Sequence, residues 1–86
     1  VAQYVNNINL VDVMTMNPAI RLSEGQRVRY KIRHQPGFNN GTLKLSESTD
    51  KLTIISDESI SGVAAGQFGV IYHETEPVVI GSGVIG

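Results

Sequence analysis

The sequence contains no cysteine and no tryptophan, and its only aromatic residues are three tyrosines and two phenylalanines. Without cysteine the chain can form no disulfide bond, thiolate metal site or cysteine nucleophile. No apolar run approaches the roughly 18 residues that span a bilayer. Val1 begins neither a charged nor an apolar leader segment, and ordinary domain sequence starts at once. We therefore expect one small domain over residues 1–86, a fragment of a longer protein, with no membrane partner.

Charged residues are few and unevenly distributed, although the net charge is only −1. Residues 1–44 contain six cations and two acids, a balance of +4, whereas residues 45–86 contain one cation and six acids, a balance of −5. The near-neutral total argues against indiscriminate binding to polyanions. A local basic face can still bind phosphate if the acids lie elsewhere.

Residues 26–36 alternate between cationic and apolar side chains. In an extended chain Val28, Tyr30 and Ile32 point to one face and the cations point to the other. The same residues in a helix would leave no apolar face wide enough to bury. We therefore predict a strand with an apolar inner side and a cationic outer side. The cationic stripe of this strand consists of Arg27, Arg29, Lys31 and Arg33.

The composition, rich in Val, Ile, Gly, Thr, Ser and Asn, favours short strands joined by tight turns. The predicted strands cover residues 3–14, 26–36, 42–47, 51–56, 67–73 and 78–85. Asn40-Gly41 is predicted to close a hairpin, Gly66 to adopt a positive φ, and residues 57–66 to be irregular. Six strands without helices predict an all-β fold, a small antiparallel six-stranded β-barrel.

Alternation also predicts which side chains of the other strands face the core. The inward positions are Tyr4, Ile8, Leu10, Leu43, Leu45, Leu52 and Ile54. Lys44 points outward and extends the cationic face. Residues 67–73 and 78–85 are continuously apolar, which predicts that the barrel core covers one of their faces and a neighbour outside this chain covers the other. Gly81-Ser82-Gly83 opens no helix, so we expect its glycines at a bulge or at a close strand crossing.

Candidates for catalysis or metal binding are few. Two histidines, His34 and His73, make a poor metal site in a chain without cysteine. Glu74 and Glu76 lie in a predicted exposed turn, whereas acid–base catalysis needs a cleft that shifts the pKa of its carboxyl groups. We expect no catalytic, cofactor-binding or metal-binding residue in this chain.

The cationic stripe is the strongest candidate for a binding site. Its side chains lie ~6.7 Å apart along a strand, close to the separation of successive phosphates in an RNA backbone. One alternative is a solvated outer face, and another is ion pairing with Glu47, Asp57 or Glu58 on adjacent strands. The candidate nucleic-acid-binding residues are Arg27, Arg29, Lys31, Arg33, His34 and Lys44.

Three segments occur in a characteristic order: residues 31–36 (Lys-Ile-Arg-His-Gln-Pro), 65–72 (Ala-Gly-Gln-Phe-Gly-Val-Ile-Tyr) and 80–85 (Ile-Gly-Ser-Gly-Val-Ile). Their order and spacing resemble landmarks of the C-terminal β-barrel of tRNA-specific 2-thiouridylases, also described as tRNA (5-methylaminomethyl-2-thiouridylate)-methyltransferases. The resemblance covers essentially the whole chain. It departs from the family pattern at His34, at Ala65 in place of a proline, and at Ser82 in place of a glycine.

The resemblance implies a barrel similar to domain II of translation factors and to aminomethyltransferase barrels, a fold that by itself is a weak guide to function. It implies a cytoplasmic parent enzyme that uses ATP with Mg²⁺ to activate the wobble uridine, whose oxygen is replaced by sulfur from a persulfide donor protein. This chain lacks the phosphate loop and the cysteines of that reaction. We therefore expect a non-catalytic C-terminal domain that helps to position tRNA for the catalytic and central domains.

Two alternatives remain from the sequence. The first is a purely structural barrel that docks on the other domains through its apolar strands and does not contact RNA. The second is an independent enzyme, which would require turnover by these residues alone, and no motif in the sequence supports it.

Overall fold

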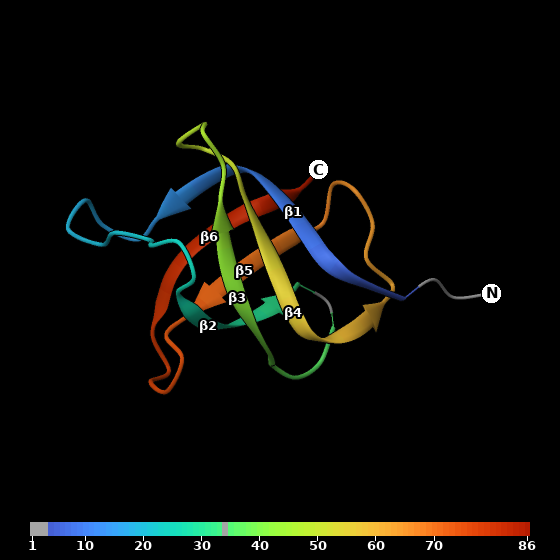
Figure 1. Ribbon diagram of the computed structural model, residues 1–86. Coiled ribbons are helices and arrows are strands. Elements are labelled where there is room, and N and C mark those ends of the chain that lie inside the picture. The colour runs from blue at the N-terminus through green and yellow to red at the C-terminus, as the bar shows by residue number, and fades with distance from the viewer. Residues whose placement is uncertain (1–3, 34) are drawn as a thin grey trace.

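The computed structural model describes residues 4–33 and 35–86 and consists of strands and connecting turns (Figure 1). The strands are β1 (Tyr4–Thr15), β2 (Arg27–Ile32), β3 (Asn39–Leu45), β4 (Leu52–Ser61), β5 (Phe68–Tyr72) and β6 (Val79–Ile85). They close into a barrel in the order β1-β4-β3-β2-β5-β6, and every neighbouring pair is antiparallel. No helix within the described part of the chain is long and apolar enough to cross a membrane. The predicted six-stranded antiparallel barrel is confirmed.

The inner side of β2 contributes three side chains to the barrel core. Val28, Tyr30 and Ile32 are each at most 1% exposed, as the alternating pattern predicts. Burying an aliphatic or aromatic side chain to this extent contributes roughly 1.5–3 kcal/mol, so this strand supplies a large share of the core energy. The remaining buried apolar side chains are Ile8, Leu10, Leu43, Leu52, Ile54, Ile71, Ile80 and Ile85.

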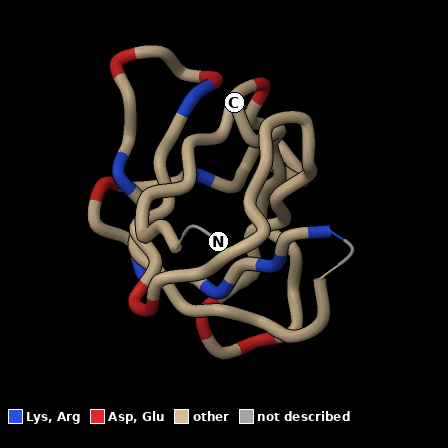
Figure 2. The backbone as a smooth tube through the Cα atoms, turned by 90° about the vertical axis from the view of Figure 1, so that its right-hand side faces the viewer, with Lys and Arg blue, Asp and Glu red and all other residues tan. Residues whose placement is uncertain are grey.

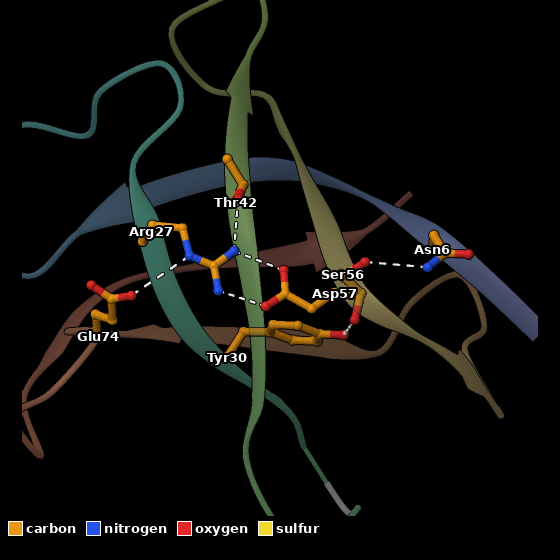
Figure 3. Close-up of polar contacts among 7 residues, drawn as sticks. All are labelled: Asn6, Arg27, Tyr30, Thr42, Ser56, Asp57 and Glu74. Atoms are coloured by element: carbon orange, nitrogen blue, oxygen red, sulfur yellow. Dashed lines mark hydrogen bonds and ion pairs between the residues drawn. The ribbon is translucent and has the colours of Figure 1, made fainter.

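One hydrogen bond between side chains crosses this core. The Tyr30 hydroxyl and the Ser56 Oγ lie 2.7 Å apart, and both residues are buried. Burial raises the pKa of the Tyr30 hydroxyl, and the hydrogen bond to Ser56 opposes that effect. The backbone carbonyl of Ser56, on β4, also accepts a hydrogen bond from the side chain of Asn6 on β1 (Figure 3). Ser56 therefore links β4 to both β2 and β1.

The hairpin between β2 and β3 is present, but the prediction that Asn40-Gly41 forms its turn is wrong, because both residues lie inside β3. Gly41 pairs with Val28 on one side and with Ser56 on the other. A Cβ at Gly41 would lie 2.8 Å from Ile54 Cγ2, so the glycine allows β4 to approach β3 closely. The chain turns earlier, around Gly37, whose φ is 82°. Gly41 therefore allows close packing of two strands rather than a turn, and the Asn-Gly dipeptide alone does not distinguish these two roles.

Two strand boundaries also differ from the prediction. The basic strand ends at Ile32, where the chain turns and the Gln35 N–H donates to the Ile32 carbonyl. Residues 57–61, predicted to be irregular, continue β4, and Ile60 and Ser61 pair with the start of β1. Cross-strand pairing therefore overrides their polar composition, because β1 offers backbone partners that the local sequence does not reveal.

Two side chains predicted to face inward are partly or largely exposed. Tyr4 is 67% exposed, because the β1–β4 register shifts between Val5 and Asn7 and the alternation is interrupted there. Leu45 is 38% exposed at the last position of β3, where the strand leaves the barrel. The other side chains predicted to face inward are buried: Ile8, Leu10, Leu43, Leu52 and Ile54.

The predicted turns and the close strand crossing in the second half are confirmed. The hairpin between β5 and β6 is closed by the His73 N–H, which donates to the Val78 carbonyl, and Gly66 has a φ of 92°. A Cβ at Gly81 would lie 3.0 Å from the Met14 carbonyl oxygen, and one at Gly83 would lie equally near the Leu10 Cβ. The two glycines therefore let β6 approach β1 closely.

Candidate nucleic-acid interface

The cationic stripe lies on the outer side of β2, as the alternating pattern predicts. Arg27, Arg29 and Lys31 belong to the strand, and Arg33 follows it directly with its backbone N–H still bonded to the Phe68 carbonyl on β5. In Figure 2 the Lys and Arg positions succeed one another along this strand, while the Asp and Glu positions lie off it. The barrel thus presents several cations on one face.

Arg27 differs from the rest of the stripe because it has acidic partners. Its guanidinium donates two hydrogen bonds to the Asp57 carboxylate, one of them 2.7 Å long, and another to the Thr42 hydroxyl (Figure 3). The Glu74 carboxylate lies 3.6 Å from Arg27 Nε. Hydrogen bonding from Arg27 lowers the pKa of Asp57, and the same contact raises the pKa of Arg27. Of the alternatives given for the cationic stripe, Arg27 therefore follows ion pairing with an adjacent strand.

Arg29 contacts backbone carbonyls and an aromatic ring. Its Nε donates to the His73 carbonyl at 3.1 Å and its Nη2 to the Glu76 carbonyl at 2.8 Å. The guanidinium carbon also lies 4.9 Å from the centroid of the Phe38 ring. Carbonyl groups carry no net charge, so the positive charge of Arg29 is not neutralised by these contacts. Arg29 both holds the β5–β6 turn and keeps a cation on this face.

Lys31 and Arg33 lie among aromatic side chains. Lys31 Nζ is 5.9 Å from the Phe38 ring centroid, and the Arg33 guanidinium carbon is 5.8 Å from that of Phe68. The Phe38 and Tyr72 rings meet edge to face, with centroids 4.8 Å apart. Both ion pairs found within residues 4–33 and 35–86 involve Arg27. Lys31 and Arg33 therefore present their charges beside aromatic rings rather than beside carboxylates.

These groups border a shallow depression of about 410 Å³ on the outer face of β2, β5 and β6. Its volume lies in the range of small-ligand sites, roughly 300–1,000 Å³. The lining residues are Lys31, Arg33, Phe68, Val70, Tyr72 and Ser82. Cations beside exposed aromatic rings are the combination that proteins use to bind phosphates and to stack bases. We call this surface, together with Arg29 and Phe38, the aromatic-cationic face.

The other candidate residues do not join this face. Lys44 is exposed on β3 and lines a separate depression of about 260 Å³ with Asn7, Asn9 and Thr53. His34 lies outside the described residues. His73 accepts hydrogen bonds from backbone N–H groups of its own turn through Nδ1, which gives this ring a structural role.

The aromatic residues of the face were not identified as site residues from the sequence. Within this chain the outer face of residues 67–73 is open, because Phe68 is 47% exposed and Val70 and Tyr72 are only partly buried. The second cover that their apolarity predicts stays a prediction about a neighbour outside this chain. Gly69 and Ile71 face the core instead. The alternation of Phe68, Val70 and Tyr72 was the available signal, and it was obscured because the inward residues between them are also apolar.

Comparison with known proteins matches this chain to one domain family. A family model described as the aminomethyltransferase beta-barrel domain matches residues 4–85. The tRNA-specific 2-thiouridylase MnmA 1 of Bacteroides thetaiotaomicron is 40% identical over 78 residues, which cover 91% of this chain and 22% of that protein. The tRNA-specific 2-thiouridylase MnmA 2 of Bacteroides fragilis is 44% identical over 73 residues, covering 85% and 20%.

A third relative, the tRNA-specific 2-thiouridylase MnmA of Parabacteroides distasonis, is 35% identical over 85 residues, covering 96% of this chain and 23% of that protein. The chain thus spans about a fifth of the length of the curated relatives it matches. No solved structure matches it. The resemblance to the barrel domain of tRNA-specific 2-thiouridylases is confirmed by these matches. The chain belongs to the aminomethyltransferase beta-barrel domain family.

Proposed function

We propose that this barrel is a non-catalytic accessory domain of a tRNA-modifying enzyme and helps to position tRNA. The relatives named above are tRNA-specific 2-thiouridylases, which supports tRNA as the substrate of the longer protein. In this proposal the enzyme acts in the cytoplasm and thiolates the wobble uridine. ATP with Mg²⁺ and a persulfide sulfur-donor protein serve its catalytic and central domains, which lie outside this chain.

The observation that carries the proposal is the group of cations on the aromatic-cationic face that have no acidic partner among residues 4–33 and 35–86. Arg29 and Lys31 occupy alternate positions of β2, ~6.7 Å apart. Arg33 follows the strand directly, in the turn after Ile32. Their charges are not balanced by the carboxylates that balance Arg27. A row of such cations attracts a phosphate backbone because each contact releases condensed counterions.

The experiment compares two charge-removing double variants of the full-length protein. Lys31→Gln with Arg33→Gln removes two cations of the face and spares Arg29, which also holds the β5–β6 turn. Arg21→Gln with Lys51→Gln is the matched control, because these cations line a different depression of about 480 Å³ near Leu45 and Ser46. Both doubles change the net charge equally.

We expect the first double to reduce the slope of log K against log salt for tRNA by roughly 1.4–1.8, as two lost phosphate contacts predict. The control double leaves the slope nearly unchanged. Equal slopes for both doubles and the unmodified protein would contradict the proposal. A titration of the full-length protein with and without the barrel, at two salt concentrations, measures the total contribution of the domain.

A second candidate function is a purely structural barrel that docks on the catalytic domains without contacting RNA. The partial exposure of Phe68 and Val70 on the same face favours it, because an apolar sheet face is a common docking surface. This alternative predicts that Val70→Glu disrupts the full-length enzyme, whereas Lys31→Gln with Arg33→Gln leaves its activity and its salt slope intact. The two candidates thus make opposite predictions for the same pair of cations.

A further inference from the structure

The aromatic-cationic face is built from rows of side chains that cross three strands. Arg29 pairs with Tyr72, and Lys31 pairs with Val70, which in turn pairs with Ser82 on β6. In the last row the Arg33 backbone bonds to Phe68, which pairs with Val84. Each row therefore places a cation, either on β2 or directly after it, beside an apolar or aromatic side chain on β5.

The two phenylalanines of this face have different surroundings. Phe38 already contacts the cations of Arg29 and Lys31 and the edge of Tyr72, and it lines a further depression with Asp57 and Glu58. Those carboxylates repel phosphate groups. Phe68 borders the depression that contains Lys31 and Arg33. Among the described residues, only the Arg33 guanidinium makes a cation–π contact with the Phe68 ring. Phe68 is therefore the ring best placed for an anionic ligand that also carries a flat ring.

We propose that Phe68 stacks on an unpaired base of RNA while Lys31 and Arg33 bind the phosphates that flank this base. This inference rests on the proposed function and specifies which part of the RNA the barrel recognises. A base in a duplex is stacked on its neighbours and does not expose its face, whereas an unpaired base in a loop or at an end can stack on an aromatic side chain. A phosphate row alone would bind a duplex equally well, so the exposed ring is the feature that selects unpaired RNA.

The charge distribution favours RNA over an apolar protein partner at this position. A protein segment that covered Phe68 and Val70 would also have to desolvate Lys31 and Arg33, which have no acidic partner within the described residues. Phosphate groups of RNA supply that partner. The Ser82 side chain, in the same depression, adds a polar group within the site.

The test uses this chain with two probes, a single-stranded oligouridylate and a blunt RNA duplex with the same number of phosphates. Phe68→Ala removes the ring, and Phe68→Leu keeps apolar area without an aromatic face. We expect both variants to weaken oligouridylate binding roughly 5- to 150-fold, the usual effect of losing one stacked base. The salt slope stays unchanged because no phosphate contact is lost, and duplex binding changes less than twofold.

Phe68→Trp supplies a second readout, because the chain contains no tryptophan of its own. Its fluorescence should be quenched by the oligouridylate, and much less by the duplex. Ile55→Trp is the matched control, since Ile55 is also an exposed apolar residue but lies on β4 in another depression. Thermal unfolding of each variant checks that the barrel is intact.

Several outcomes would overturn the inference. These are unchanged oligouridylate affinity of Phe68→Ala, full affinity of Phe68→Leu, and equal quenching at Phe68→Trp and Ile55→Trp. The stacking inference also fails if this chain binds neither probe while Lys31→Gln with Arg33→Gln still lowers the salt slope of the full-length protein. In that case the proposed function stands. If that slope is unchanged as well, both fail.

Discussion

The buried Tyr30–Ser56 hydrogen bond makes a quantitative prediction about the stability of the barrel. Tyr30→Phe removes one hydroxyl and leaves the Ser56 hydroxyl buried without its partner. Ser56→Ala does the reverse and leaves the Tyr30 hydroxyl in the core. Each change should destabilise the fold by about 1–3 kcal/mol, because a buried polar group that loses its partner incurs its desolvation cost. The double variant removes both polar groups, so it should be no less stable than the worse single variant.

The assay is a double-mutant cycle measured by thermal and chemical unfolding. For a domain of this size 1 kcal/mol corresponds to a shift in Tm of about 4–8 °C, so the single variants are readily resolved. Tyr4→Phe is the matched control, because Tyr4 is largely exposed and should change stability by less than about 0.5 kcal/mol. If the two single effects add within ~0.5 kcal/mol in the double variant, the hydroxyls do not act as a pair and the reasoning is refuted.

The same pair predicts a response to high pH. The pKa of Tyr30 in the folded barrel is raised above its ordinary value of 10.0. The neutral hydroxyl therefore stabilises the fold fully below pH 10, and this contribution is lost as the pH rises through the folded-state pKa. The stability of the unmodified chain should thus fall more steeply above pH 10 than that of the double variant Tyr30→Phe with Ser56→Ala. Parallel pH profiles for the two proteins would contradict this.

Further predictions concern glycine positions and the Arg27 ion pair. Gly41→Ala should destabilise the barrel by about 1–3 kcal/mol through overpacking, because its Cβ would lie 2.8 Å from Ile54 Cγ2. At Gly66 an added Cβ would meet no atom within 4 Å, so Gly66→Ala introduces only backbone strain at a φ of 92°. This strain should lower the free energy of unfolding by about 1–2 kcal/mol. Denaturant unfolding of both variants tests whether Gly41→Ala is the more destabilising. Asp57→Asn should lower the Tm at neutral pH, because Arg27 holds the pKa of Asp57 below 3.8. The stabilisation from the Asp57 carboxylate is present above pH 3.8 and is lost as the pH falls through the folded-state pKa of Asp57. The Tm values of the unmodified chain and of Asp57→Asn should therefore converge in acid. A constant difference in Tm down to low pH would be inconsistent with this pairing.

Long-range contacts account for the boundaries that the sequence could not predict. Asn40-Gly41 has the composition of a turn, yet Gly41 lies in β3 because β4 packs closely against it. Residues 57–61 are mostly polar and still form the end of β4, where Ile60 and Ser61 pair with Val5 and Tyr4 of β1. Asp12 adopts a φ of 51° where the β1–β6 register shifts, which no local signal indicates. Each case depends on a strand that is distant in the sequence.

The sequence by itself determined the all-β class, the six strands and the two sides of β2, because a period of two alone decides which side chains share a face. It therefore placed Tyr30 in the core and the cationic stripe outside. Only the tertiary structure decided which cations keep a charge without an acidic partner. Asp57 is 30 residues from Arg27 along the chain. It reaches Arg27 because only β3 separates β2, which carries Arg27, from β4, which carries Asp57. Closure also brings Phe68 of β5 beside Arg33, since a strand pairs with neighbours that chain order does not specify.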